Sequence, residues 1–199
     1  SRGLGDVYKR QYLSSGTSLR LIAFGGKEET YMAWDYASKE DMEKYGRRYN
    51  PCGEYTASDG STAYYPNQFD HFVQHHIQLI GAQSLGRDWR LNVTFHYTKG
   101  DGYYDQYKTG RTLVEYGLKP FVNAEGETVE KSDLVRLKYN DNDFGGGMFN
   151  ISYTGRRLNA VFGGAANWHR GNHFGQVAWV RNYVGPIDPL QQYLSLIHI

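Results

Sequence analysis

An alternation of apolar and polar residues over residues 89–99 is the clearest structural signal in the chain. One series of alternate positions is apolar: Trp89, Leu91, Val93, Phe95 and Tyr97. The other series is polar: Arg90, Asn92, Thr94, His96 and Thr98. Successive side chains of a strand point to opposite faces, so this segment is predicted to form a strand with one apolar face. Its length matches the roughly 9–11 residues that a tilted strand needs to cross a bilayer.

The same two-residue period recurs at residues 17–25, 71–85, 147–154 and 158–168. Short connections at 86–88 (Gly-Arg-Asp) and 155–157 (Gly-Arg-Arg) join four of the five predicted strands in pairs. Short glycine-containing connections between alternating segments are typical of antiparallel hairpins. We therefore predict two hairpins and a fifth strand.

The connections at the other ends of these strands are long and rich in Tyr, Asp, Lys and Gly, over residues 26–70 and 100–133. Loops of this length are uncommon in compact domains and are usually functional. Within the first, Ser38 and Asp41 have the spacing of a capping box and predict a short helix through Tyr45.

Short turns at one end and long loops at the other are the asymmetry of outer-membrane barrels. The 18 Tyr, 24 Gly and absence of an apolar run long enough for a membrane helix fit the same class. The predicted fold is all-β, an antiparallel membrane-spanning β-barrel fragment. It would contribute about five or six strands of a larger barrel, with short periplasmic turns and long extracellular loops.

The two ends of the chain share one DNA sequence. Residues 6–11 and 194–199 can be encoded by strands that are reverse complements of each other, and this DNA resembles the transposase end sequence of shotgun sequencing libraries. Residues 1–5 fit the matching primer tail. We therefore expect 1–11 and 194–199 to be translated adapter and 12–193 to be part of the barrel.

Charge and motifs give no sign of a nucleic-acid partner or of an enzyme. The net charge of +1 becomes −1 once the adapter, with three basic and one acidic side chain, is left out. We find no catalytic triad order, phosphate loop or Cys/His cluster, and predict no cofactor and no metal. His75 and His76 would point to opposite strand faces, residues 140–145 lack the calcium-loop spacing, and Cys52 is expected to be structural or unpaired.

Aromatic residues in the long loops are the candidate ligand-binding residues, because Tyr and Trp give a large contact area with few rotatable bonds. They are Tyr31, Trp34, Tyr36, Tyr55, Tyr103, Tyr104 and Tyr107, with Tyr64 and Tyr65 nearby. His169 and His173, in a third loop over 169–190, complete the set. The same rings could instead pack the loops against each other.

Three segments occur together that resemble TonB-dependent outer-membrane receptors of the Bacteroidetes type. They are residues 49–55 (Tyr-Asn-Pro-Cys-Gly-Glu-Tyr), 95–108, and 168–175 (Trp-His-Arg-Gly-Asn-His-Phe-Gly). The likeness covers most of residues 19–179. It implies a barrel of about 22 strands around an N-terminal plug.

The resemblance also implies a function, namely import of an iron complex, cobalamin or glycan with energy delivered by TonB. The expected partners are outer-membrane lipid, the small-molecule or glycan substrate, and TonB through a part of the parent outside this chain. Arg90, Asn92, Thr94 and His96 would then face the lumen. Two alternatives remain open: a secreted β-sandwich or lectin-like binding module, and a passive porin-type barrel.

Overall fold

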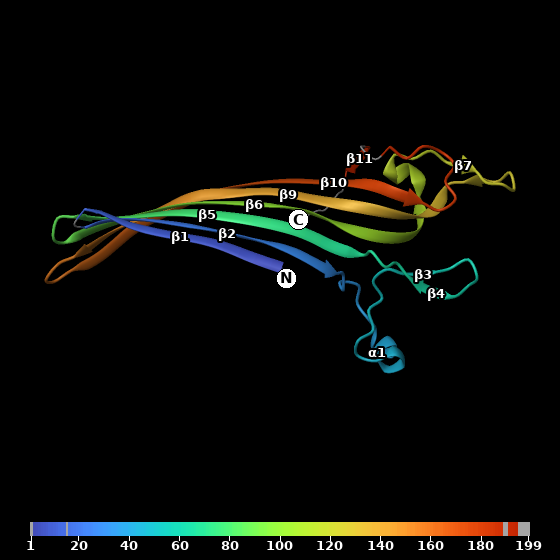
Figure 1. Cartoon of the computed structure of the whole chain (residues 1–199), viewed down its shortest axis with the longest axis horizontal. Helices are drawn as coiled ribbons and strands as arrows, with labels where there is room; N and C mark the ends of the chain where they lie inside the picture. Colours follow the sequence, from blue (N-terminus) through green and yellow to red (C-terminus); the bar gives the residue numbers. More distant parts are fainter. Residues whose placement is uncertain (1, 15, 189–190, 195–199) are drawn as a thin grey trace. The chain divides into compact units, whose positions relative to one another are not determined.

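The computed structural model describes residues 2–14, 16–188 and 191–194. Its main element is one open antiparallel sheet with the strand order β1-β2-β5-β6-β9-β10-β11 (Figure 1). These strands are β1 (Arg2–Ser14), β2 (Thr17–Tyr31), β5 (Phe69–Leu85), β6 (Trp89–Thr112), β9 (Lys131–Thr154), β10 (Asn159–Val180) and β11 (Gln192–Leu194). The all-β, antiparallel prediction is confirmed.

The remaining elements are short and lie in the connections. Two hairpins are formed by β3 (Glu54–Thr56) with β4 (Thr62–Tyr64), and by β7 (Phe121–Val122) with β8 (Thr128–Val129). The helices are α1 (Lys39–Tyr45) and the 3-10 helix η1 (Leu113–Tyr116). No helix in the described part of the chain is long and apolar enough to cross a membrane.

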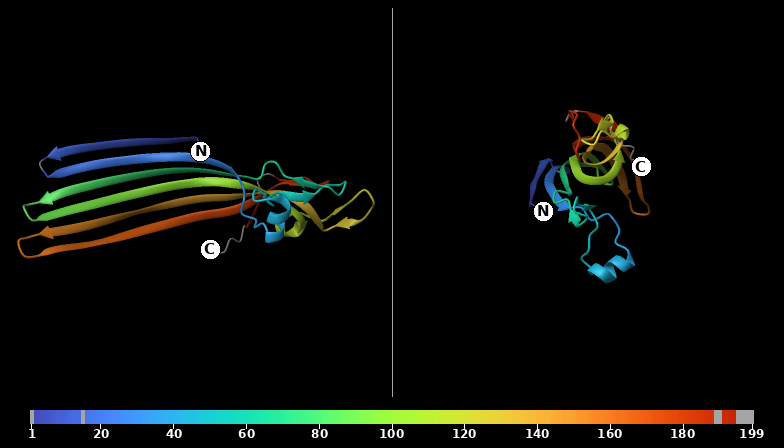
Figure 2. Two further views of the ribbon diagram at one scale, coloured as in Figure 1. Left: turned by 90° about the horizontal axis from the view of Figure 1, so that it is seen from below. Right: turned by 90° about the vertical axis from the view of Figure 1, so that its right-hand side faces the viewer.

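The short helix and both short turns are where the sequence predicts them. Ser38 caps α1 by accepting a hydrogen bond from the Asp41 amide, and the Asp41 carboxylate accepts one from the Ser38 amide. Residues 86–88 and 155–158 join the long strands at the turn end of each hairpin (Figure 2). Gly86 has a φ of 79°, which a glycine adopts without strain.

The predicted loop boundaries are wrong, because the strands continue into all three predicted loops. Strand β6 extends to Thr112 and β9 begins at Lys131, so the loop between them is far shorter than 100–133. Strand β2 extends to Tyr31, and β10 covers 159–180, whereas residues 189–190 lie outside the described residues. A polar segment stays in a strand as long as a neighbouring strand offers backbone partners, and Tyr itself favours strands.

The segment assigned to the sequencing adapter takes part in the sheet. Strand β1 pairs antiparallel with β2, from Arg2 opposite Lys27 to Ser14 opposite Thr17. Leu194 ends β11, whereas Ser1 and residues 195–199 lie outside the described residues. The DNA origin of residues 1–11 and 194–199 stays a prediction, and no functional argument below uses them.

The chain divides into two compact units. The turn unit comprises Ser1–Glu28, Phe72–Asp101 and Asp141–Asn172, and the loop unit comprises Glu29–His71, Gly102–Asn140 and His173–Ile199. The loop unit has a small hydrophobic core. Its buried members are Leu113, Tyr116, Leu118, Leu134, Val177 and Val180.

Candidate functional site

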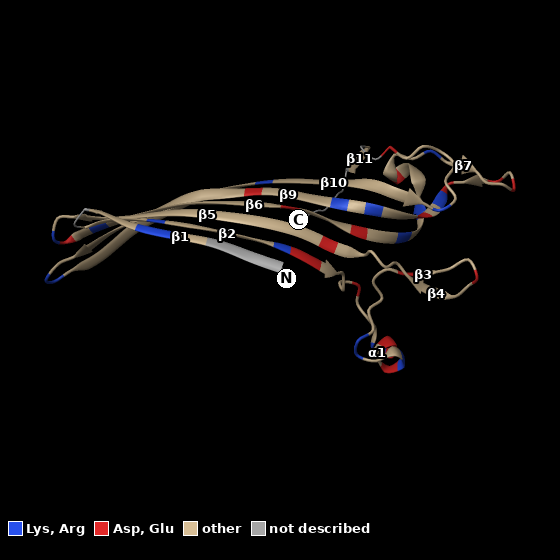
Figure 3. Cartoon of the chain, viewed as in Figure 1, with Lys and Arg blue, Asp and Glu red and all other residues tan. Residues whose placement is uncertain are grey.

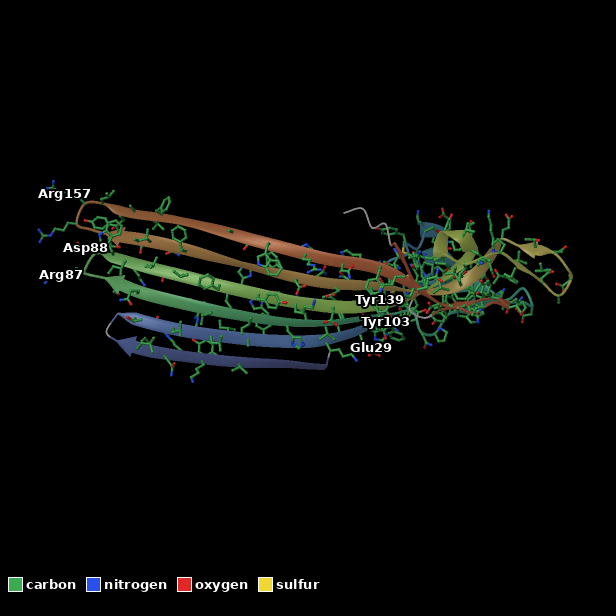
Figure 4. All side chains as sticks on the ribbon, turned by 90° about the horizontal axis from the view of Figure 1, so that it is seen from above. Glu29, Arg87, Asp88, Tyr103, Tyr139 and Arg157 are labelled. Atoms are coloured by element: carbon green, nitrogen blue, oxygen red, sulfur yellow. The ribbon has the colours of Figure 1, made fainter. Side chains whose placement is uncertain are left out.

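Within the turn unit, four neighbouring strands share a band without a single charged side chain. No Asp, Glu, Lys or Arg occurs at residues 72–86, 91–98, 144–155 or 158–169, which lie on β5, β6, β9 and β10 or directly beside them. The corresponding part of the sheet is free of blue and red in Figure 3. Arg87, Asp88 and Arg157 lie beyond the band at the turns (Figure 4).

One face of this band is apolar and exposed. Phe95 is 59% exposed and Phe162 is 69% exposed, although both belong to the apolar series of their strands. Aromatic contacts stand at both ends of the face, since the rings of Trp89 and Tyr153 lie 4.9 Å apart and those of Tyr97 and Trp168 lie 6.2 Å apart. Large exposed apolar surfaces of this kind mark contact with a partner or a membrane.

Ion pairs follow directly after the second aromatic contact. The ammonium of Lys99 pairs with the carboxylates of Asp141 and Asp143, and the Tyr97 hydroxyl donates to Asp143 at 2.5 Å. The apolar face therefore ends at the ring of Tyr97, whose hydroxyl is hydrogen-bonded to Asp143. Both acidic residues of 140–145 thus have partners within the protein, and this segment lacks the spacing of a calcium loop.

The other face of the band carries a set of side-chain hydrogen bonds. Asn92 donates to Asn150 Oδ1 at 2.8 Å, and the ring of His96 lies 3.0 Å from Asn167 Oδ1. On the neighbouring strand, the ring of His76 contacts the Thr98 hydroxyl at 2.7 Å. Arg90 is exposed and Thr94 is half-buried. The predicted division of β6 into an apolar and a polar face is thus present, whereas its orientation toward a lumen stays a prediction.

In the loop unit, the predicted ligand-binding aromatics have three different surroundings. Some are used within the fold: the Tyr31 hydroxyl donates to the backbone carbonyls of Cys52 and Tyr65. Cys52 itself is fully buried, as expected of a structural cysteine, and its sulfur accepts from the Asp35 amide. Tyr36, by contrast, is 99% exposed.

The other aromatics lie against each other across neighbouring segments. The rings of Tyr55 and Tyr107 stack at 4.5 Å, and Trp34 meets Tyr104 edge-on at 4.6 Å. Tyr103 lies beside Tyr139 at 5.4 Å (Figure 4). Aromatic pairs contribute about 0.5–1.5 kcal/mol beyond their buried area, so these rings hold the loop unit together.

His169 and His173 both lie on β10 and not in a loop. Four residues of a strand span about 13 Å, which is too far for two side chains to hold one metal ion. Among the described residues, no three His, Cys, Asp or Glu side chains lie close enough to hold a metal.

A polar network that the sequence did not suggest fixes Tyr107. Its hydroxyl donates to Asp133 Oδ2 at 2.9 Å and accepts from Arg181 at 2.9 Å. Arg181 also pairs with Asp133 at 3.2 Å, and the Gly110 amide donates to the other carboxylate oxygen. Burial, followed by the hydrogen bond to Asp133, raises the pKa of Tyr107 to about 12.

This network lines a cavity of about 700 Å³ in the loop unit. Its lining includes Tyr49, Glu54, Tyr55, Thr109, Asp133 and Arg181. The acidic groups already have partners, because Asp133 is held as described and Glu54 accepts from the hydroxyls of Tyr49 and Tyr64. The polar groups of the cavity are therefore largely satisfied by the protein itself.

Replacing Asp133 by Asn is expected to destabilise the loop unit by about 1–3 kcal/mol. The amide nitrogen would face donors on Tyr107, Arg181 or the Gly110 backbone, and a buried donor without an acceptor costs about that much. Hydrogen exchange at the Gly110 amide measures the effect, with the exposed Asp101→Asn as control. Equal exchange in the two variants would contradict the role of Asp133.

The sequence prediction missed three further candidate binding residues, all cations of the loop unit. They are Lys108 on β6 and Arg136 and Lys138 on β9. All three are half-buried, and Lys and Arg positions gather on this part of β6 and β9 in Figure 3. Lys108 lies within the predicted loop over 100–133, and a loop residue has no predictable strand face. The signal was available, because Arg136 and Lys138 have the two-residue spacing that places them on one face of a strand.

No protein-family model matches this chain, and neither the curated proteins nor the solved structures contain a match to it.

Proposed function

We propose that this chain is part of the wall and outer entrance of a TonB-dependent outer-membrane receptor that imports a scarce nutrient. The observation that carries the proposal is the charge-free band of β5, β6, β9 and β10, with its exposed apolar face between aromatic contacts. Membrane-spanning barrels have an apolar outer band about 25 Å tall, flanked by aromatic girdles. The eight residue steps from Trp89 to Tyr97 cover about 27 Å along the strand, and about 20 Å of membrane height after a tilt of about 40°.

The exposure of the apolar face supports a barrel wall over a β-sandwich. A sandwich would bury this face under a second sheet at about 10 Å. Phe95 of β6 and Phe162 of β10 are instead more than half exposed, at 59% and 69%. In the proposed barrel wall, lipid acyl chains would cover this face.

Active import, in preference to passive diffusion, is supported by the resemblance of residues 49–55, 95–108 and 168–175 and by the aromatic content of the loop unit. An exposed ring such as that of Tyr36 suits capture of a dilute solute. The parent receptor would supply the plug, the TonB-contacting segment and the strands that close the barrel. Recovering the adjoining upstream reading frame should reveal a plug, and a complete barrel gene without one would leave the passive porin as the function.

Membrane insertion can be tested with the tryptophans that stand at the ends of the apolar face. In a variant with Trp34→Phe and Trp179→Phe, only Trp89 and Trp168 remain. After refolding into vesicles, their fluorescence should be quenched by lipids brominated near the headgroup more strongly than by lipids brominated near the bilayer centre. A chain that melts cooperatively in buffer without detergent and is not quenched by either lipid would favour the β-sandwich.

A further inference from the structure

Arg136 of the loop unit has a fixed position on the sheet. Gln106, which is 6% exposed, accepts two hydrogen bonds from the Arg136 guanidinium at 2.7 and 3.0 Å. The contact between Tyr103 and Tyr139 fits the same antiparallel register of β6 and β9. In this register Lys108 lies diagonally across from Arg136, and such positions are about 7–8 Å apart.

Lys138 brings a second ammonium close to the same guanidinium. It follows Arg136 by two residues on β9 and so shares its face at about 6.6 Å. Burial lowers the pKa of both Lys108 and Lys138, and the charge of Arg136 lowers each further. The negative charge of Asp35 raises the pKa of Lys108. In the described ranges, however, no carboxylate forms an ion pair with Arg136 or Lys138.

The neighbours of Arg136 accept hydrogen bonds from it but do not neutralise its positive charge. Besides Gln106, the Tyr116 hydroxyl accepts a hydrogen bond from Arg136 at 3.1 Å. Three of the five guanidinium N–H bonds thus point to neutral acceptors, which leaves at most two for the Tyr193 oxygen and a further acceptor. A half-buried cation held in place by neutral groups is electrostatically favourable only when an anion joins it.

Tyr193 adds a donor without an acceptor at the same place. Its hydroxyl is buried and finds no acceptor for its proton within the described ranges, and its ring packs against Tyr116 at 4.9 Å. Burial raises the pKa of Tyr193 to about 12, so the hydroxyl keeps its proton at neutral pH. The charge of Arg136 and a side-chain hydrogen bond from it act against this rise, so the guanidinium lies next to the Tyr193 oxygen. The open positions around Arg136 are therefore donors, and the missing group is an acceptor.

We propose that Lys108, Arg136, Lys138 and Tyr193 form a binding site for the carboxylates of the imported solute, which would make the substrate a polycarboxylate. A guanidinium N–H and a carboxylate oxygen form a charge-assisted hydrogen bond, which is about twice as strong as a neutral one. Cations spaced about 7 Å apart fit several carboxylates on one molecule better than one compact phosphate. Counted along the sequence, Lys108 falls on the even positions of β6 that we predict to face the lumen.

This inference rests on the proposed import function, but its first test does not. The full chain, refolded in neutral detergent micelles, is titrated by calorimetry with tricarballylate, inorganic phosphate or maltotriose. We expect tricarballylate to bind, more weakly as the salt concentration rises, phosphate to bind at least about tenfold more weakly, and maltotriose not to bind. Arg136→Gln should weaken tricarballylate binding at least about tenfold, because it removes a charged hydrogen-bond donor.

Smaller losses of about threefold to fivefold are expected for Lys108→Gln, Lys138→Gln and Tyr193→Phe. Lys131→Gln is the matched control, since Lys131 is an exposed cation on the same strand as Arg136. Binding that Lys131→Gln weakens as much as Arg136→Gln, or that phosphate matches, would overturn the assignment of this site.

The carboxylate that binds this cluster could come from the solute or from an acidic side chain in another part of the parent receptor. The same titration of the complete parent receptor separates the two sources. Retained binding in the parent supports a solute site, and its loss there shows that the parent's own carboxylate occupies the cluster. The import proposal is tested separately, by the upstream reading frame and by the quenching experiment. The import proposal and the binding-site proposal can therefore fail independently.

Discussion

Replacing Val93 by Arg is expected to cost about 2–4 kcal/mol of folding free energy in a bilayer. Val93 lies in the middle of the apolar series of β6, between the aromatic contacts at Trp89 and Tyr97. A guanidinium at the bilayer midplane of a barrel wall carries that cost, whereas near the interfaces the cost falls to about 0–1 kcal/mol. Folding into vesicles at increasing concentrations of guanidinium chloride measures it.

Thr94→Arg is the matched control for Val93→Arg, because Thr94 is the next residue of the same strand and belongs to the polar series. If Thr94 faces an aqueous lumen, its replacement should cost about 0–1 kcal/mol. The same comparison can be made with Leu91→Arg and Asn92→Arg. Equal costs on the two faces would contradict the assignment of the odd positions to lipid.

The two-residue period correctly located the strands in the part of the sheet that has one apolar and one polar face. Between Trp89 and Tyr97 every second position is apolar, and such a strict alternation is readable in the sequence. Beyond Lys99 both faces tolerate polar side chains, so the pattern fades although the strand continues to Thr112. For this reason the strands were predicted too short and the loops too long.

The candidate site shows a similar division. The abundance of Tyr pointed to Tyr55 and Tyr107 as ligand-binding residues, and the structure shows their rings stacked on each other, which is the packing role stated as the alternative. The partners that fix Tyr107, Asp133 and Arg181, are 26 and 74 residues away in the sequence. Such contacts depend on which strands are neighbours in the sheet, and single-sequence patterns do not contain that information.

Truncation of Leu134 to Ala is the second large expected effect, with a loss of about 2–5 kcal/mol of stability in the loop unit. Leu134 is fully buried in the core formed with Leu113, Leu118, Val177 and Val180. The substitution removes three buried carbon atoms and leaves a cavity that the surrounding strands can only partly fill. Hydrogen exchange at the Leu113 amide, which donates to the Glu130 carbonyl at 2.9 Å, measures the loss locally.

Val114→Ala separates core packing from a general effect of removing apolar atoms. Val114 is next to Leu113 in η1 but is 61% exposed, so its truncation should change exchange by less than about 0.5 kcal/mol. The same core holds Tyr116, whose hydroxyl positions Arg136. Leu134→Ala should therefore also weaken tricarballylate binding, whereas Val114→Ala should leave it unchanged. Loss of stability without any loss of binding would show that Arg136 keeps its position through Gln106 alone.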